Sequence, residues 1–278
     1  MEAQNLGQMA RMLGLSFDPY FAVALVGLIM ARTLPMVVLS PIFGGKTVTG
    51  QIKVGIAVIL MVTLYPMLAP AVEGKLPLRG LAYWGLIMKE AAVGGLIGFV
   101  SSIVFQAIES AGHLIDIQRG TAQASVLVPQ LDIQGPVFAN LHVQLGIVLF
   151  LILNLHHIFL RGYYESFLII PVNLYPQLSK LSLPFIEELI KVTAGIFLVS
   201  VQLTAPILVA LFMVDVVLGV ANRIAPQVNV YFLGQPIKAA VGIVMFVVAF
   251  TFILRQIGVL FMNMLQDIKI LLKFFALE

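Results

Sequence analysis

Six long apolar runs divide this chain, and they constrain its fold more than any other feature of the sequence. They cover about residues 20–39, 52–70, 81–108, 137–160, 186–221 and 237–262. A helix of about 20 apolar residues crosses the hydrocarbon core of a bilayer, and each run is of that order. Because lipid offers the backbone no hydrogen-bond partners, such runs must be helical. The sequence therefore predicts an all-α, polytopic protein of the membrane type.

The composition agrees with this prediction. The chain is 60% hydrophobic and only 10% charged, whereas a soluble domain has roughly 25% charged residues. These charges are too few to cover a water-facing surface, so we expect membrane lipid around the protein. The net charge of +3 is small and the basic residues are dispersed, which predicts no nucleic-acid ligand. With no cysteine, disulfides and thiolate metal sites are excluded.

Prolines predict a break within the fifth apolar run and an end to it. The fifth run is too long for one straight crossing and contains Pro206, so we expect a kink or two separate halves. Pro226 should end that helix. The following NVYFLGQP sequence, residues 229–236, is rich in turn-forming residues and predicts a re-entry into the last run.

Asp215 lies within one of the most apolar parts of the fifth run. An ionised group at mid-membrane depth costs roughly 2.5 to 3.5 kcal/mol, so this side chain should face protein or water and have a partner. Asn222 and Arg223 fall on the same side of a helix, and Arg223 is the nearest candidate partner. Asp215 is either a satisfied packing residue or a functional group.

Other charges and glycines in the apolar runs predict contacts between helices. Arg32 either snorkels to an interface or binds a partner's backbone or carboxylate, and snorkelling is favoured. Lys89 and Glu90 do not share a helix face, so we expect them to have separate partners. Gly94 and Gly98 form a GxxxG motif, which lets another helix approach closely.

Residues 109–136 form the least lipid-compatible central stretch, ESAGHLIDIQRGTAQASVLVPQLDIQGP. Ionisable and amide side chains alternate there with small residues and glycines. Polar non-helical backbone at membrane depth must be buried in protein or line a wet cavity. The alternative is an exposed loop between helices.

No constellation of catalytic residues or metal ligands is recognisable. The GGKT sequence at residues 44–47 resembles a phosphate-binding loop, but Ser40 stands where that motif requires glycine. His156 and His157 are neighbours and point in different directions, so they are poor joint metal ligands. We therefore expect no enzyme, no metal and no cofactor. Two classes compete: a secondary transporter using Asp215 as a proton relay, and a structural subunit of a larger channel.

Four segments in order carry a resemblance over nearly the whole chain. They are RTLPMVVLSPIFGGKTVTGQIKVG from Arg32, KEAAVGGLIGF from Lys89, AGHLIDIQRGTAQASVLVP from Ala111 and VDVVLGVANRIAPQVNVYFLGQPIK from Val214. Together they resemble the FliR/SctT family of type III secretion export-gate proteins, found in flagellar and injectisome systems. The IDIQRG sequence is more similar to the injectisome branch and NLHHIFL to the flagellar branch, and the injectisome branch is favoured.

The resemblance implies a core, non-enzymatic subunit of the export apparatus in the bacterial inner membrane. Members of this family assemble with FliP/SctR-like and FliQ/SctS-like proteins into a funnel-like helical gate for unfolded substrates, and an FlhB/SctU-like protein lies nearby. Such a hetero-oligomer sits largely above the plane of the bilayer. By this resemblance, residues 1–180 are a FliP/SctR-like part and residues 181–278 a FliQ/SctS-like hairpin of kinked helices.

The resemblance also implies roles for individual residues. The segment from Gly112 to Pro129 matches the plug of the closed channel. Its polar plug or latch residues would be Gly112, His113, Asp116, Gln118, Arg119 and Gly120. Contacts between helices or subunits are predicted at Arg32, Lys89, Glu90, Gly94, Gly98, Asp215, Asn222, Arg223, Pro226, Gln227 and Asn229.

Overall fold

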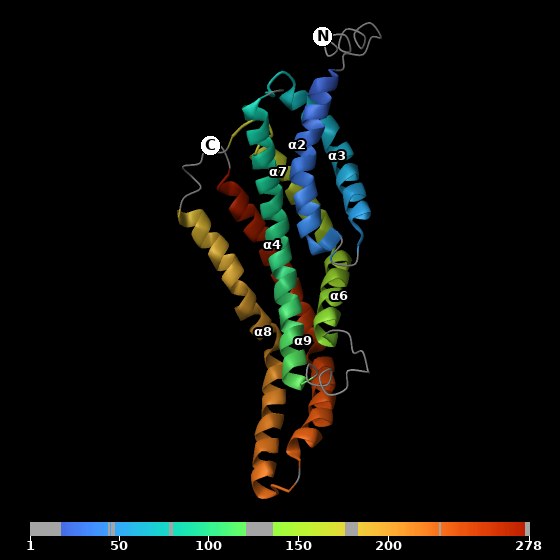
Figure 1. Ribbon diagram of the computed structural model, residues 1–278, viewed down its shortest axis with the longest axis vertical. Coiled ribbons are helices and arrows are strands. Elements are labelled where there is room, and N and C mark those ends of the chain that lie inside the picture. Colours follow the sequence, from blue (N-terminus) through green and yellow to red (C-terminus); the bar gives the residue numbers. More distant parts are fainter. Residues whose placement is uncertain are drawn as a thin grey trace. The chain divides into compact units, whose positions relative to one another are not determined.

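Helices make up nearly all of the described chain in the computed structural model (Figure 1). The structure describes residues 18–43, 45, 48–77, 80–120, 136–175, 183–227 and 229–275. The elements are α2 (Pro19–Leu39), the 3-10 helix η1 (Pro41–Phe43), α3 (Gly50–Val72), α4 (Leu81–Arg119), α6 (Val137–Ile152), α7 (Leu155–Ile169), α8 (Leu183–Ile224) and α9 (Val230–Lys273).

Five of these helices are long and apolar enough to cross a membrane, namely α2, α3, α4, α8 and α9. The pair α6 and α7 passes the same test only when taken together, which would make six spans within the described residues. The predicted all-α, polytopic membrane class is thus confirmed. The single helix expected over residues 137–160 is wrong, because α6 and α7 meet at a 75° bend. Asn154 lies at this bend with φ 55°, a left-handed conformation that asparagine tolerates better than most residues.

Helix α4 is longer than its apolar run predicted. It continues eleven residues beyond 108, so the polar sequence up to Arg119 is helical and is neither irregular backbone nor an exposed loop. Buried side chains at Ile108, Ala111 and Ile115 keep the helical spacing of three and four residues through this stretch, which explains the extension. Gly120 follows with φ 77°, the conformation that commonly ends a helix. The rest of the predicted plug, residues 121–129, lies outside the described residues.

The last two helices also differ from their predicted bounds. Helix α8 is continuous through Pro206, so two separate halves are not formed, although Figure 1 shows α8 changing direction along its length. It ends at Ile224, just before Pro226, as predicted. Helix α9 begins at Val230 and includes Pro236, so the expected turn-rich re-entry is wrong. The side chain of Asn229 accepts a hydrogen bond from the Phe232 amide at 3.4 Å, which caps this early start.

The chain divides into two units. Unit 1 comprises Met1–Ser102, His157–Glu188 and Gln266–Glu278, and unit 2 comprises Ile103–His156 and Leu189–Leu265. In unit 1, buried side chains of α2, α4 and α7 form the core, including Leu28, Val93 and Phe167. In unit 2, the rings of Phe105, Phe150 and Phe261 pack together with centroids 5.0–6.4 Å apart.

Candidate functional site

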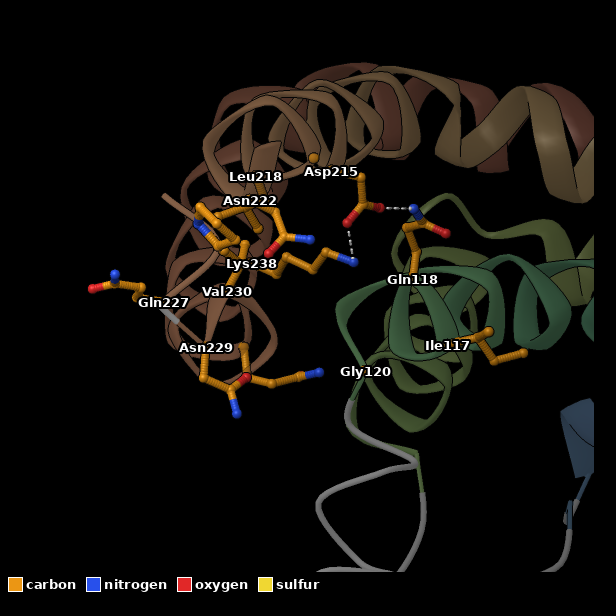
Figure 2. A pocket seen from close by; sticks show the side chains of 14 residues that line it. Ile117, Gln118, Gly120, Asp215, Leu218, Asn222, Gln227, Asn229, Val230 and Lys238 are labelled. Carbon is orange, nitrogen blue, oxygen red and sulfur yellow. Dashed lines mark hydrogen bonds and ion pairs between the residues drawn. The ribbon is translucent and has the colours of Figure 1, made fainter. Parts of the chain in front are cut away.

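A polar recess in unit 2 is the main candidate site (Figure 2). Its volume is about 750 Å³, and its walls come from the end of α4, the end of α8 and the start of α9. The recess brings together seven of the residues predicted from the sequence: Gln118, Gly120, Asp215, Asn222, Pro226, Gln227 and Asn229. Two sequence motifs almost a hundred residues apart therefore line one cavity.

Asp215 joins three helices at the wall of this recess. Its carboxylate forms an ion pair with Lys238 of α9 and accepts a hydrogen bond of 2.8 Å from Gln118 of α4, and both interactions are visible in Figure 2. The side chain of Asp215 is 37% exposed and that of Lys238 is 18% exposed, so the pair is partly screened by solvent. One carboxylate thus connects α4, α8 and α9 within unit 2.

Arg223 is not the partner of Asp215, and this correction has a simple geometric cause. Arg223 lies two turns along α8 from Asp215 and is exposed. Lys238 belongs to α9, the second helix of the hairpin that α8 and α9 form. A partner on the facing helix reaches the carboxylate without stretching along α8. Sequence reasoning missed Lys238. A lysine near the start of an apolar run needs an acidic partner, and this was a signal that could have identified it.

Reversing the charge of Asp215 should disrupt the end of the hairpin. In Asp215→Lys, two ammonium groups face each other and Gln118 loses its acceptor, so we expect loss of partner co-purification from detergent-solubilised membranes. The double variant Asp215→Lys, Lys238→Asp should recover part of this loss, because the exchanged side chains again carry opposite charges. Normal assembly of the single variant, or no recovery in the double variant, would contradict the role assigned to this pair.

The remaining predicted plug residues lie elsewhere on α4. Asp116 accepts hydrogen bonds from the Phe138 and Ala139 amides at the start of α6, at 2.9 and 3.1 Å. Arg119 donates to the Ala239 carbonyl of α9 at 3.3 Å. His113 is partly exposed and lies 4.0 Å from Glu109, one turn earlier. Gly112 packs against the backbone of α6.

A buried ionic cluster lies in unit 1, and it corrects two expectations. Arg32 is fully buried and pairs with Glu90 through Nε and Oε2, which are 2.5 Å apart, so Arg32 does not snorkel. Lys89 also pairs with Glu90, at 2.6 Å, so these neighbours share a contact instead of having only separate partners. Long side chains allow this contact although the two residues leave the helix in different directions. We call Arg32, Lys89 and Glu90 the Arg32 cluster.

The end of α7 completes the Arg32 cluster. Arg32 donates to the Ser166 hydroxyl at 3.1 Å and to the Ile170 carbonyl at 2.8 Å, and its guanidinium lies 4.0 Å from the centre of the Phe167 ring. Lys89 donates to the carbonyls of Pro171 and Leu174 at 2.8 and 3.0 Å. Two cations thus balance one carboxylate and several carbonyls at a helix C-terminus, where partial negative charge gathers.

The two glycines of the GxxxG motif lie against α2. A Cβ at Gly94 would be 1.9 Å from the Arg32 carbonyl oxygen, and one at Gly98 would be 2.9 Å from Leu39 Cβ. Sequence reasoning did not identify Ser166 or Tyr163 as polar partners in this region. Tyr163 is buried and hydrogen-bonded to Thr33 at 2.5 Å. The sequence carried no signal for either, because their partners, Arg32 and Thr33, lie on α2 and not within the same segment.

Across the ranges that the structure describes, no group of three or more His, Cys, Asp or Glu side chains is arranged to hold a metal ion. Both sites are instead built from ion pairs, amides and backbone carbonyls, which join helices to one another.

Comparisons with known proteins show the family of this chain. The family described as "Bacterial export proteins, family 1" matches residues 23–264. The chain is 30% identical over 248 residues to "Flagellar biosynthetic protein FliR" of Bacillus subtilis (strain 168), covering 88% of this chain and 93% of that protein. It is 31% identical over 222 residues to "Yop proteins translocation protein T" of Yersinia pestis, covering 80% and 84%. A third relative, "Secretion system apparatus protein SsaT" of Salmonella typhimurium, is 24% identical over 71% of this chain and 76% of its own length. The chain therefore belongs to the FliR/SctT family, whose members are structural components of the type III secretion export apparatus in the bacterial inner membrane.

Proposed function

We propose that this chain is a core subunit of the export gate. Together with FliP/SctR-like and FliQ/SctS-like subunits, and close to an FlhB/SctU-like protein, it forms the channel through which unfolded substrates cross the inner membrane. The observation that carries this proposal is the polar recess of unit 2, where residues of the proposed plug segment meet residues of the last hairpin. A polar recess in so apolar a chain should be filled by water or by protein instead of lipid.

The surface of α8 supports a place inside a larger assembly. Phe197, Val209, Phe212 and Val217 are each more than half exposed in the isolated chain. We propose that partner helices cover much of this face, with lipid on the remainder. In this proposal α8 and α9, after residue 181, are the FliQ/SctS-like part, and the residues before it are the FliP/SctR-like part.

The pairing of Asp215 supports a structural role for this residue. Asp215 is paired with Lys238 of α9 and accepts a hydrogen bond from Gln118 of α4, so its contacts join three helices, as a structural residue requires. The relatives include a flagellar biosynthetic protein and a Yop translocation protein. The secondary-transporter alternative has no observation in its favour. We propose a passive gate, for which another component of the apparatus supplies the transport energy.

We further propose that the segment after α4 plugs the closed channel. A strain carrying a deletion of residues 121–128 should leak small ions and solutes through a complex that still assembles. Residues 112–119 are left in place because they belong to α4 and contact α6 and α9. The measurement is dye or ion entry into cells, with co-purification of partner subunits as the control for assembly. Unchanged permeability in an assembled complex would overturn the plug assignment.

The IDIQRG sequence at residues 115–120 supports the injectisome branch, and we propose that the chain serves a virulence-type system. In a strain lacking the gene, secretion of injectisome substrates should stop while swimming continues. Loss of swimming with intact secretion would assign the chain to the flagellar branch instead.

A further inference from the structure

Helix α6 begins without a cap of its own. The residue at its N-cap position is Pro136, and no side chain at that position bonds the first turn. The first amides of a helix have no partner within the helix, and leaving them unpaired in a buried place is costly. The start of α6 therefore needs an acceptor from another part of the chain.

Asp116 supplies that acceptor from α4. One oxygen of its carboxylate accepts from both the Phe138 and the Ala139 amides, and the residue is only 4% exposed. A carboxylate is favoured at this position because the amide groups there carry partial positive charge. The residue that supplies the cap lies 22 residues earlier in the chain than Phe138.

Gly112 lets the two helices come close enough for this bond. A Cβ at position 112 would lie 2.3 Å from Ala139 Cα and 2.5 Å from the Phe138 carbonyl oxygen. Because these neighbours are backbone atoms, a larger residue could be accommodated only by moving α6 away from α4. Gly112 and Asp116 lie four residues apart on one face of α4, and both contact the first turn of α6.

Arg119 holds the last turn of α4 in place. Its guanidinium lies 4.5 Å from the centre of the Phe138 ring and bonds the Ala239 carbonyl of α9. A Cβ at Gly242 of α9 would come within 2.6 Å of the Arg119 side chain, so the arginine fits against a glycine. The end of α4 is thus fixed to α6 and to α9 inside unit 2.

We propose that Asp116, with Gly112, is a positioning residue that holds both ends of the segment 121–135. Helix α4 ends at one end of this segment and α6 begins at the other, and the Asp116 carboxylate joins the two directly. This clamp determines where the segment starts and where it returns. The inference rests on the proposed plug function of the segment, and it assigns Asp116 a role outside the plug itself.

The test compares Asp116→Ala with three other variants in the full complex. Gln106→Ala, at an exposed position on the same helix, is the control. Asp116→Asn keeps the size and one acceptor oxygen but loses the charge. The double variant Asp116→Ala, Pro136→Asp gives α6 a cap of its own without restoring the bond to α4. The two measurements are amide hydrogen exchange in the first turn of α6 and leakage of small ions through the assembled complex.

In Asp116→Ala we expect amide exchange at the start of α6 to rise about fivefold, the change in opening equilibrium that loss of one helix cap produces. We expect leakage to rise above that of Gln106→Ala. Asp116→Asn should fall between this variant and Gln106→Ala. In the double variant, exchange should return to normal while leakage stays high, because α6 is capped again but is no longer tied to α4. This combination would support the proposal.

Three other outcomes would overturn it. If the double variant also stops leaking, Asp116 acts only by capping α6. A second outcome is that Asp116→Ala exchanges and leaks like Gln106→Ala while the 121–128 deletion leaks. This result would contradict the positioning role of Asp116 and leave the plug assignment supported. If neither Asp116→Ala nor the deletion leaks, the plug assignment itself fails, and the positioning role falls with it.

Discussion

Replacing Glu90 by alanine should remove a large part of the stability of this protein. The change leaves Arg32 and Lys89, which are 0% and 8% exposed, without their shared carboxylate. Breaking a buried ion pair from one side costs roughly 3 to 5 kcal/mol, against a total stability of about 5–15 kcal/mol for a typical protein. We expect a low steady-state level in membranes and an early transition in a denaturant titration of the purified protein in detergent.

Arg161→Ala is the matched control for this experiment. It breaks another ion pair of unit 1, that with Glu165, in which the side chains are 81% and 38% exposed. Solvent-exposed pairs one helical turn apart contribute less than about 0.5 kcal/mol, so this variant should behave like the wild type. Glu90→Gln should fall between the two, since it keeps an acceptor but loses the charge. Equal unfolding midpoints for Glu90→Ala and Arg161→Ala would contradict the structural role of the Arg32 cluster.

The substitution Gly94→Ala should have the second large effect, although it adds a single methyl group. The new Cβ would lie 1.9 Å from the Arg32 carbonyl oxygen and 2.7 Å from its carbon. Because both atoms belong to backbone, α2 and α4 must separate, and such overpacking costs about 1–3 kcal/mol or more. Moving the backbone of Arg32 would also disturb its bond to Glu90. The measurement is the unfolding midpoint in detergent.

Gly95 provides a control at the neighbouring position. A Cβ there would meet nothing within 4 Å, and alanine is favoured over glycine in a helix interior by about 0.8–1.0 kcal/mol. Gly95→Ala should therefore be neutral or slightly stabilising. If Gly94→Ala were as stable as Gly95→Ala, the close approach of α2 and α4 at this point would be wrong.

The sequence predicted the helices best where an apolar run is bounded by turn residues. Helices α2 and α3 begin and end within two residues of their predicted bounds. Helix α4 was predicted too short, because its last turns carry polar side chains that are satisfied by other helices. The bend at Asn154 could not be predicted, since an asparagine in an apolar run has no periodicity that marks a left-handed residue.

The sites were predictable only as sets of residues. Burial cost indicated that Asp215 needed a partner, and it has one. For Arg32 the favoured expectation was snorkelling, whereas its side chain is buried and paired. Which partner each one has depends on tertiary packing: Lys238 lies 23 residues after Asp215, and Glu90 lies 58 residues after Arg32. Helical spacing within one segment cannot reveal such pairs. The partners of Asp116 are backbone amides. No pattern of side chains in the sequence predicts a hydrogen bond to the backbone of another helix.

The Arg32 cluster has a consequence for how the protein is synthesised. Arg32 leaves the ribosome 58 residues before Glu90 and 138 residues before the Ile170 carbonyl. At about 5–20 residues per second, its carboxylate partner emerges roughly 3–12 s later. During this interval α2 carries an unpaired guanidinium, which opposes its transfer into hydrocarbon. An arginine at the centre of a span costs roughly 2.5–3.5 kcal/mol on insertion scales, so pairing with α4 removes a penalty that α2 carries as long as it is alone.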